Sequence, residues 1–356
     1  VSARSSRPSR LDTHGSAHRL CLPRAALGAP GDGCRPSAGT LHRREGLVAA
    51  LSPALLPALS WSPAEAAAAQ PPPIAVAGSA KPMPALGFGT CCRRGSQGPP
   101  LIQAAKFYLA SGGRLIDTAQ LYENHKDVAV AIRESKIPRD ELWVTSKVDP
   151  TEVRTREEVV QSVDRSLREL GLEYIDLMLL HGAEGWGIAP DEDQAFWKGL
   201  IDAQKAGKVR NIGVSNHNRR EIERLTAATG VQPAVNQIEY HPWVPKETKD
   251  LVRWCQDRGI AVTAYGSLGG AGNKAQGEIV EDVAEARGGT NAQVLLRWAI
   301  DQGVAVIPGA SSESHIKENL DVMAVSLGPK DVAALEGAER PYSFRRWHSC
   351  KSGCAD

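Results

Sequence analysis

The chain lacks an excess of charge of one sign, a paired set of cysteines, and an apolar run long enough to cross a membrane. It has 42 basic and 41 acidic residues among 356, so we expect no strongly basic surface for nucleic acid. Its seven cysteines are an odd number at spacings that form neither a disulfide framework nor a zinc site, so we expect mostly reduced thiols and no metal centre. The apolar run at residues 47–59 is short and interrupted by proline, which excludes a stable membrane-spanning helix there.

Residues 1–70 are rich in arginine, serine, alanine, glycine and proline, and their acidic residues are only Asp12, Asp32, Glu45 and Glu65. This composition predicts a targeting or disordered segment rather than a folded domain. Arg43 and Arg44 precede the apolar run and an alanine-rich stretch at 64–69, a pattern typical of twin-arginine signals. With its Arg/Ser-rich leader, the segment resembles the bipartite transit peptides of thylakoid-lumen proteins. We therefore expect a chloroplast protein, in the thylakoid lumen if the twin-arginine signal is used; the alternative is a disordered, alanine-rich extension of a cytoplasmic protein.

From residue 71 the sequence alternates short β-like runs with amphipathic helical stretches, which is the pattern of a parallel α/β fold. The whole chain of 356 residues is long enough for one barrel of about 250 residues with extra segments, or for two ordinary domains. Eight β/α units favour a (β/α)8 TIM barrel over residues 71–342, followed by a tail at 343–356. We also expect a β-hairpin at 74–84 that plugs the bottom of the barrel, and one extra helix after Gly328. The strands are expected at residues 85–89, 114–117, 142–147, 175–180, 209–215, 234–239, 261–265 and 305–307.

Helical periodicity is clear between the third and fourth expected strands. Val159, Val163, Leu167 and Leu170 recur at helical spacing. We therefore expect a helix at residues 156–170.

Four ionisable or proton-carrying residues follow the expected strands: Asp117, Tyr122, Lys147 and His181. In a β/α barrel they would share the rim at the C-terminal ends of the strands, where active sites are built. The set suits proton transfer to a carbonyl oxygen, because an ammonium lowers the pKa of a neighbouring tyrosine, a carboxylate orients the lysine, and a histidine hydrogen-bonds the carbonyl. Taken singly, each residue has a structural alternative. Asp117 would cap a turn, Lys147 would be a solvated strand end, and His181 would be a satisfied core histidine.

Several short motifs around these residues carry a family resemblance. They are MPALGFGT at 83–90, IDTA at 116–119 with Tyr122 and Asn124, TSK at 145–147, GKVRNIGVSN at 207–216, NQIEYHP at 236–242, and VIPG at 306–309 leading to Glu318 and Asn319. Over about residues 74–342 the chain resembles the aldo-keto reductase superfamily. The resemblance implies a barrel that transfers a hydride from a nicotinamide cofactor directly to a carbonyl carbon, without a metal. It also implies roles for the four rim residues: Tyr122 as proton donor, Lys147 and Asp117 as its tuning partners, and His181 as the residue that orients the carbonyl.

The resemblance further implies positions for the cofactor. Ser215, Asn216 and Gln237 match residues that hold the nicotinamide carboxamide, and Tyr265 matches the ring that stacks on the nicotinamide. Donor-rich loops at helix N-termini suit the phosphates, although Ser215 and Asn216 could instead cap the next helix. Gly266, Ser267 and Leu268 are expected at the pyrophosphate, and Glu318 and Asn319 at the adenine. The expected cofactor-binding residues are Gly89, Thr90, Asp117, Ser215, Asn216, Gln237, Tyr265, Gly266, Ser267, Leu268, Ser311, Ser312, His315, Glu318 and Asn319.

Three departures from the family pattern concern the choice of cofactor. Many members have Lys-Ser after Ile-Pro and an arginine six residues after that lysine, and these residues grip the 2′-phosphate of NADPH. Here the three positions hold Gly309, Ala310 and His315. The hydroxyls of Ser311 and Ser312, helix-end amides, His315 and Lys317 remain as possible phosphate contacts. We therefore expect NADP(H), with NAD(H) as the alternative.

Further departures lie in the expected substrate pocket, which consists of Cys91, Tyr122, His181 and Gly182. Cys91 stands where the family often has an aromatic residue, and Gly182 stands where tryptophan is common. Both changes predict a larger pocket. His125 replaces the usual glutamate after Asn124, and the sequence suggests no interpretation of it.

The sequence thus predicts an NADPH-dependent, monomeric enzyme that reduces a small carbonyl compound, namely an aldehyde, ketone or dicarbonyl, to an alcohol. A regulatory subunit that binds nicotinamide nucleotide with little turnover is one alternative, and the intact set of four rim residues argues against it. A lyase that uses Lys147 as a Schiff base is another alternative. Asp117 should raise the pKa of Lys147, which argues against the lyase.

Overall fold

The structure is a computed structural model that describes residues 70–93, 95–269 and 277–338. The expected targeting segment at 1–70, apart from Gln70, and the expected tail at 343–356 lie outside the described residues. Within the described part, no helix is both long and apolar enough to cross a membrane.

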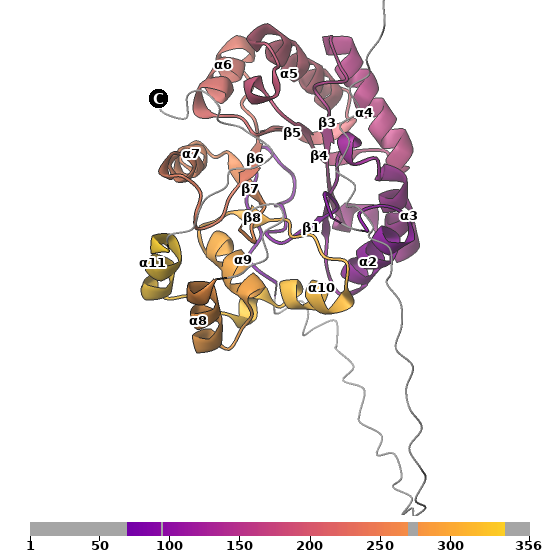
Figure 1. Cartoon of the computed structure of the whole chain (residues 1–356). Helices are drawn as coiled ribbons and strands as arrows, with labels where there is room; N and C mark the ends of the chain where they lie inside the picture. The colour runs from indigo at the N-terminus through magenta and orange to yellow at the C-terminus, as the bar shows by residue number, and fades with distance from the viewer. Residues whose placement is uncertain (1–69, 94, 270–276, 339–356) are drawn as a thin grey trace, which may run out of the picture. The chain divides into compact units, whose positions relative to one another are not determined.

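An eight-stranded sheet forms the centre of the described part, and helices surround it (Figure 1). Neighbouring strands are parallel, and their order follows the sequence from β1 to β8. The sheet curls back on itself, since Leu86, just before β1, forms a parallel bridge with Val306 in β8. The strands are β1 (Phe88–Gly89), β2 (Leu115–Asp117), β3 (Trp143–Val148), β4 (Ile175–Leu180), β5 (Val209–Ser215), β6 (Val235–Glu239), β7 (Ala261–Tyr265) and β8 (Ala305–Val306).

At least one helix follows each strand, which confirms the α/β class predicted from the sequence. The helix expected at 156–170 has those bounds: Thr155 caps it by accepting a hydrogen bond from the Glu158 amide, and Gly171 ends it in the left-handed region (φ 64°). The helices are α2 (Gly98–Ala110), α3 (His125–Ser135), α4 (Arg156–Leu170), α5 (Pro190–Lys205), α6 (Arg219–Thr229), α7 (Lys246–Gln256), α8 (Glu278–Arg287), α9 (Asn291–Asp301), α10 (Glu313–Leu320) and α11 (Pro329–Gly337).

Apolar residues of the strands pack into two separate cores. In β4, Leu177 and Leu179 belong to a cluster with Trp143 of β3, whereas Met178 and Leu180 belong to a larger cluster that includes helix residues. Successive strand residues point to opposite faces of a sheet, so the smaller cluster fills the inside of the curled sheet and the larger one joins the sheet to its helices. The continuous apolar runs of the strands follow from this burial on both faces.

The segment before β1 contributes to the inner core. Ile74 and Met83 pair in antiparallel fashion, with amide-to-carbonyl distances of 2.7 Å and 2.9 Å. Val76 and Met83 are buried in the same cluster as Leu115 and Trp143. Residues 85–87, which the sequence assigned to the first strand, form only the single bridge at Leu86, so β1 is shorter than expected.

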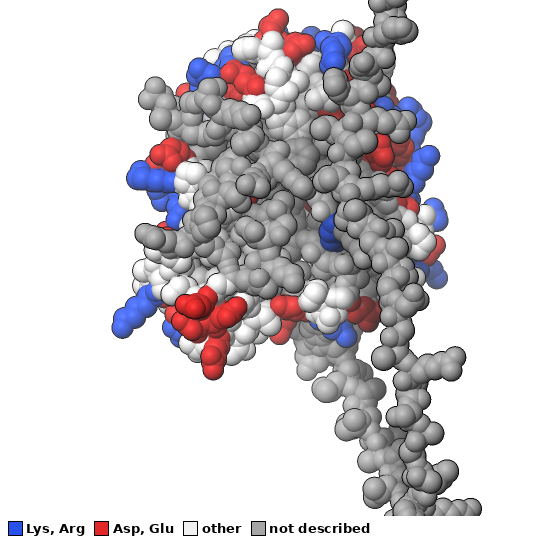
Figure 2. Space-filling model, viewed as in Figure 1, with Lys and Arg blue, Asp and Glu red and all other residues white. Residues whose placement is uncertain are grey.

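Positive and negative side chains are mixed over the helices on the face shown in Figure 2. A group of acidic side chains stands out over α8, whose sequence is EIVEDVAEAR.

Candidate active site

The rim residues expected from the sequence meet at the C-terminal ends of neighbouring strands. Asp117 is the last residue of β2, Lys147 lies near the end of β3, and His181 directly follows β4. Tyr122 ends a short 3₁₀ turn, η1 (Gln120–Tyr122), after β2. Parallel pairing places β2 beside β3 and β3 beside β4, so these three strand ends are adjacent.

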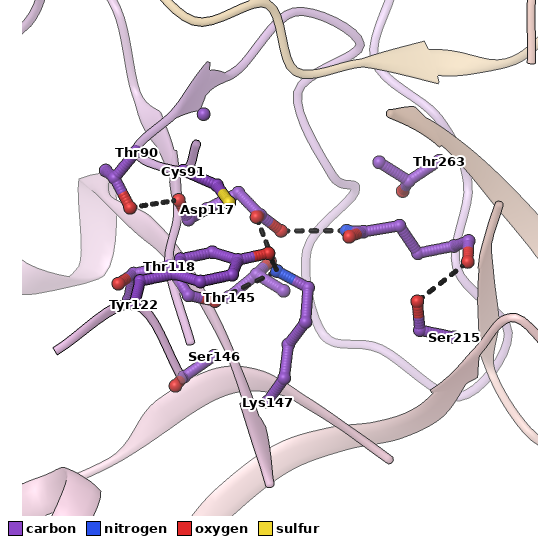
Figure 3. Close-up of polar contacts among 12 residues, drawn as sticks. Thr90, Cys91, Asp117, Thr118, Tyr122, Thr145, Ser146, Lys147, Ser215 and Thr263 are labelled. Atoms are coloured by element: carbon purple, nitrogen blue, oxygen red, sulfur yellow. Dashed lines mark hydrogen bonds and ion pairs between the residues drawn. The ribbon is translucent and has the colours of Figure 1, made fainter. Parts of the chain in front are cut away.

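Lys147 is fully buried and hydrogen-bonds three groups. Figure 3 shows it beside Asp117, Thr118 and Tyr122. Its Nζ donates to Asp117 Oδ1 at 2.5 Å, to the Thr118 carbonyl oxygen at 3.0 Å and to the Tyr122 hydroxyl at 3.3 Å. The ammonium also lies 4.9 Å from the centre of the Tyr122 ring. The solvated strand end considered as an alternative for Lys147 therefore does not describe it.

Tyr122 and His181 face each other. The Tyr122 hydroxyl lies 3.4 Å from His181 Nε2, and the two rings meet nearly edge to face at 73°. His181 Nδ1 is buried and has no hydrogen-bond partner among the described residues. Burial, and next the charge of Lys147, hold the pKa of His181 well below its usual value. His181 is therefore a neutral imidazole, which can donate only one hydrogen bond.

The acid strength of Tyr122 differs from the sequence prediction. Burial, and next the negative charge of Asp117, raise the pKa of Tyr122 well above its usual value. Burial lowers the pKa of Lys147, while the charge of Asp117 and its hydrogen bond act in the opposite direction. The net pKa of Tyr122 is thus raised, whereas the sequence predicted a fall towards neutral pH. Tyr122 keeps its proton at neutral pH and is a proton carrier rather than a phenolate.

A cavity of about 380 Å³ opens in front of these residues. Ser215 Oγ donates to the Gln237 carbonyl oxygen at 2.9 Å, and Asn216 Nδ2 donates to the His181 carbonyl oxygen at 3.0 Å. Tyr265 OH donates to Asn216 Oδ1 at 2.7 Å. The expected site residues that line the cavity are Gly89, Cys91, Asp117, Tyr122, His181, Ser215, Asn216, Gln237, Tyr265, Gly266, Ser267 and Leu268.

These amide and hydroxyl groups are fixed in place by the protein's own hydrogen bonds. Asn216 adopts a left-handed backbone conformation (φ 60°), which turns its side chain towards His181 and Tyr265. Gln237 Nε2 donates to Asp117 Oδ2 at 2.8 Å. A planar carboxamide beside an aromatic ring suits this set of donors, acceptors and the Tyr265 ring, so the residues fit a nicotinamide group.

Other expected residues lie outside the lining of this cavity. Thr90 is buried behind it, where its hydroxyl donates to the Asp117 carbonyl oxygen at 3.0 Å. Ser312 caps α10 by accepting a hydrogen bond from the His315 amide, and the side chain of Glu318 accepts one from Thr290. The expected residues that do not line the cavity are Thr90, Lys147, Gly182, Ser311, Ser312, His315, Glu318 and Asn319.

Trp186 is a cavity residue that the sequence did not reveal. It ends a short 3₁₀ turn, η3 (Glu184–Trp186), and its ring packs 5.1 Å from the His181 ring. A Cβ atom at Gly182 would lie only 2.4 Å from the Trp186 ring. The expectation that Gly182 enlarges the pocket is therefore wrong, because Trp186 fills the space from four positions further along the chain.

The sulfurs of Cys91 and Cys92 lie against each other at the edge of the cavity, where a disulfide could join them. Cys255 is free and buried. Cys91 is half-buried and Cys92 is exposed. Five described lining residues besides Trp186 had not been expected as site residues in the sequence: Cys92, Arg93, Ile307, Pro308 and Gly309.

Comparison with known proteins identifies the family of the chain. The model of the aldo/keto reductase family matches residues 85–340. A 2,5-diketo-D-gluconic acid reductase B of Corynebacterium sp. is 37% identical over 262 residues, which cover 73% of this chain and 91% of that protein. An NAD/NADP-dependent indole-3-acetaldehyde reductase of Schizosaccharomyces pombe is 34% identical over 268 residues, covering 74% of this chain and 93% of that protein.

Solved structures give the same result. The crystal structure of a Bombyx mori aldo-keto reductase in complex with NADP has a TM-score of 0.67 and 32% identity, over 75% of this chain and 92% of that chain. Such neighbours imply that the curled eight-stranded sheet is a (β/α)8 barrel. On the family match, the relatives and the shared fold, the chain belongs to the aldo/keto reductase family.

Proposed function

We propose that the protein is an NADPH-dependent reductase that converts aldehydes, ketones or dicarbonyls to alcohols. The observation that carries this proposal is the position of the Tyr122 hydroxyl, 3.3 Å from the Lys147 ammonium and 3.4 Å from His181 Nε2 at the wall of the cavity. The relatives support the substrate class, since one is named for a diketo acid and another for an aldehyde.

Tyr122 is the proposed proton donor to the carbonyl oxygen. Its raised pKa keeps the proton in place until negative charge develops on that oxygen. The Lys147 ammonium then stabilises the phenolate that is left, because the two groups are in hydrogen-bond contact. Asp117 holds Lys147 in place through the 2.5 Å ion pair. Neutral His181 donates one hydrogen bond through Nε2 and so orients the carbonyl oxygen towards Tyr122.

A nicotinamide cofactor would supply the hydride for the carbonyl carbon. Ser215, Asn216 and Gln237 are proposed to hold its carboxamide, and Tyr265 its ring face, because these side chains line the cavity beside Tyr122 and His181. The NADP bound to the Bombyx mori relative supports NADP(H), and the name of the Schizosaccharomyces pombe relative keeps NAD(H) as the alternative.

The substitution Tyr122→Phe tests this mechanism. It removes the transferable proton and leaves the ring, so NADPH oxidation with methylglyoxal or a nitrobenzaldehyde should slow by roughly 10²–10⁴-fold. The dissociation constant for NADPH should stay within about twofold of the wild-type value. Tyr174→Phe is the control, since the Tyr174 hydroxyl lies 3.5 Å from the Arg139 carbonyl oxygen, outside the cavity lining. A Tyr122→Phe enzyme with more than about a tenth of the wild-type rate would exclude Tyr122 as the acid.

We further propose the architectural details expected from the sequence. The antiparallel pair of Ile74 and Met83 plugs the bottom of the barrel, and the packing of Val76 and Met83 in the inner core supports this. Helix α11, which buries Leu335, is the extra C-terminal helix. The protein is proposed to be a monomer, which light scattering of the purified chain would test. Fusion of residues 1–70 to a fluorescent protein would test chloroplast targeting.

A further inference from the structure

Arg93 carries a positive charge to the lining of the cavity. Nη1 donates to the carbonyl oxygens of Gly89 at 2.6 Å and Cys91 at 3.5 Å, and Nη2 donates to that of Ala310 at 3.1 Å. Its guanidinium lies 5.2 Å from the centre of the Phe88 ring. Over residues 70–93, 95–269 and 277–338, no carboxylate pairs with Arg93, and its buried Nε has no hydrogen-bond partner.

Among the residues that the structure describes, no negative charge compensates that of Arg93. Backbone carbonyls accept its hydrogen bonds but carry no net charge, and burial lowers the pKa of Arg93 to about 10. Among the described lining residues there is one carboxylate, Asp117, and that group is already hydrogen-bonded to Lys147 and Gln237. The chain between Tyr265 and Glu278 has no acidic residue in its sequence. An anion in the cavity would therefore stabilise the guanidinium.

Arg93 also occupies the space next to Gly309. A Cβ atom at Gly309 would lie 2.4 Å from Arg93 Nη1 and 3.1 Å from its Cζ. Position 309 is where the family pattern often has a phosphate-gripping lysine, and here that lysine is missing. The guanidinium thus reaches, from the loop after β1, the volume that a side chain at position 309 would enter from the loop after β8.

We propose that Arg93 binds a phosphate group of the dinucleotide cofactor and replaces the missing cation at position 309. The inference rests on the proposed function, because it requires a dinucleotide in the cavity. A guanidinium forms charge-assisted, often bidentate hydrogen bonds with phosphate oxygens. The phosphate belongs either to the diphosphate, which NADPH and NADH share, or to the 2′-phosphate, which only NADPH carries.

Binding measurements on the full chain test the proposal without relying on turnover. The dissociation constants of NADPH and NADH would be measured by calorimetry for the wild type, Arg93→Gln, Arg93→Lys and the control Arg114→Gln. Arg114 also donates to backbone carbonyls, of Leu109 at 3.2 Å and Gly113 at 2.8 Å, but it precedes β2 at the other end of the sheet. Loss of a charge-assisted bond predicts that Arg93→Gln weakens NADPH binding about 10- to 100-fold. Arg93→Lys should lose less, and Arg114→Gln should bind as the wild type does.

The two cofactors identify the phosphate. Weakening confined to NADPH assigns Arg93 to the 2′-phosphate. Equal weakening of both cofactors assigns it to the diphosphate and would overturn the replacement of the lysine at position 309. Wild-type affinity of Arg93→Gln for both cofactors would overturn the proposal while leaving the proposed function intact. A wild-type chain that binds neither cofactor would overturn both. If Arg93→Gln binds both cofactors as the wild type does, but has a higher KM for glyoxylate and an unchanged KM for methylglyoxal, Arg93 holds a substrate carboxylate instead.

A second variant tests the shared position and guards against misfolding of the first. In Arg93→Ala/Gly309→Lys, the new lysine can enter the volume that the guanidinium leaves. We expect this double variant to bind NADPH at least about tenfold more tightly than Arg93→Ala does. Gly309→Lys alone should weaken binding, because its side chain meets Arg93. A double variant that binds NADPH no better than Arg93→Ala would overturn the replacement of position 309 by Arg93.

Discussion

The contact between Gly182 and Trp186 gives a prediction whose size follows from the structure. In Gly182→Ala, the new Cβ would lie 2.4 Å from two atoms of the Trp186 ring and 2.8 Å from a third. An ordinary contact is 3.4–4 Å, so the ring would have to move by at least 1 Å. The atoms concerned are Cγ and the ring carbons bonded to it, so the whole ring must shift and its packing against His181 must change. Such overpacking typically costs about 1–3 kcal/mol in the free energy of unfolding.

Urea denaturation and steady-state kinetics would both detect the shift. We expect Gly182→Ala to unfold about 1–3 kcal/mol more easily and to have a higher KM for the carbonyl substrate, because Trp186 lines the cavity. The double variant Gly182→Ala/Trp186→Leu should regain part of the stability, with a coupling energy of at least about 0.5 kcal/mol. Gly337→Ala is the control, since no atom lies within 4 Å of a Cβ added at Gly337. Wild-type stability and KM for Gly182→Ala would show that Trp186 does not occupy this space in solution.

Three further predictions concern the cofactor, the cysteine pair and a buried ion pair. His315→Arg should tighten NADPH more than NADH, because a guanidinium can take the 2′-phosphate in a charge-assisted pair. Equal tightening in a binding titration would place His315 away from that phosphate. With Cys91 and Cys92 reduced, iodoacetamide should inactivate the enzyme at mildly alkaline pH, because Cys91 lines the cavity. Cofactor with a slow substrate should protect the enzyme, and Cys91→Ala should resist. Mass spectrometry that finds the inactivating adduct on another cysteine would contradict this. Burial lowers the pKa of His217, but the charge and 3.1 Å contact of Asp193 outweigh it, so the pKa is raised. The stability that this pair contributes is fully present below the unfolded pKa of histidine, about 6.5, and is lost as pH rises through the raised folded pKa. In urea denaturation, Asp193→Asn should therefore lower the free energy of unfolding more at pH 6 than at pH 9. Equal losses at the two pH values would refute the ion pair.

The sequence predicted the parts of the fold that depend on local pattern. The helix from Arg156 to Leu170 has the predicted bounds, because its apolar period, its N-cap Thr155 and its C-terminal Gly171 all act within a few residues. Asp117, Lys147 and His181 could be placed at one rim because the ends of parallel strands meet there. Strand β1 was predicted too long, since the extent of its pairing depends on β8 rather than on its own residues.

The parts that the sequence did not predict depend on contacts between distant segments. Arg93 reaches the carbonyl of Ala310, 217 positions away in the sequence, and no local pattern indicates such a contact. His125, which had no interpretation, is buried between Glu169 at 3.0 Å and Ser146 at 2.9 Å, and neither partner lies in its own helix. Such contacts form only when the helices pack on the sheet, so the sequence alone did not predict them.

The raised pKa of Tyr122 is a further example. A lysine neighbour could be inferred from the motif, but the degree of burial and the closeness of Asp117 could not. Desolvation acts against the charged form of each group, so the direction of a pKa shift depends on the packing around the whole cluster.

The carboxylate of Asp117 makes two hydrogen bonds that reach different parts of the cavity. Oδ1 accepts from Lys147, next to Tyr122, and Oδ2 accepts from Gln237, on the side proposed for the nicotinamide. A ligand that changes the hydrogen bond of Gln237 therefore alters the charge that Lys147 and Tyr122 experience. By thermodynamic linkage the effect is reciprocal: whatever free energy a bound ligand adds to the ionisation of Tyr122, that ionisation adds to the affinity for the ligand. Asp117 thus couples ligand binding to the titration of Tyr122. The coupling can be measured as a change of ligand affinity with pH.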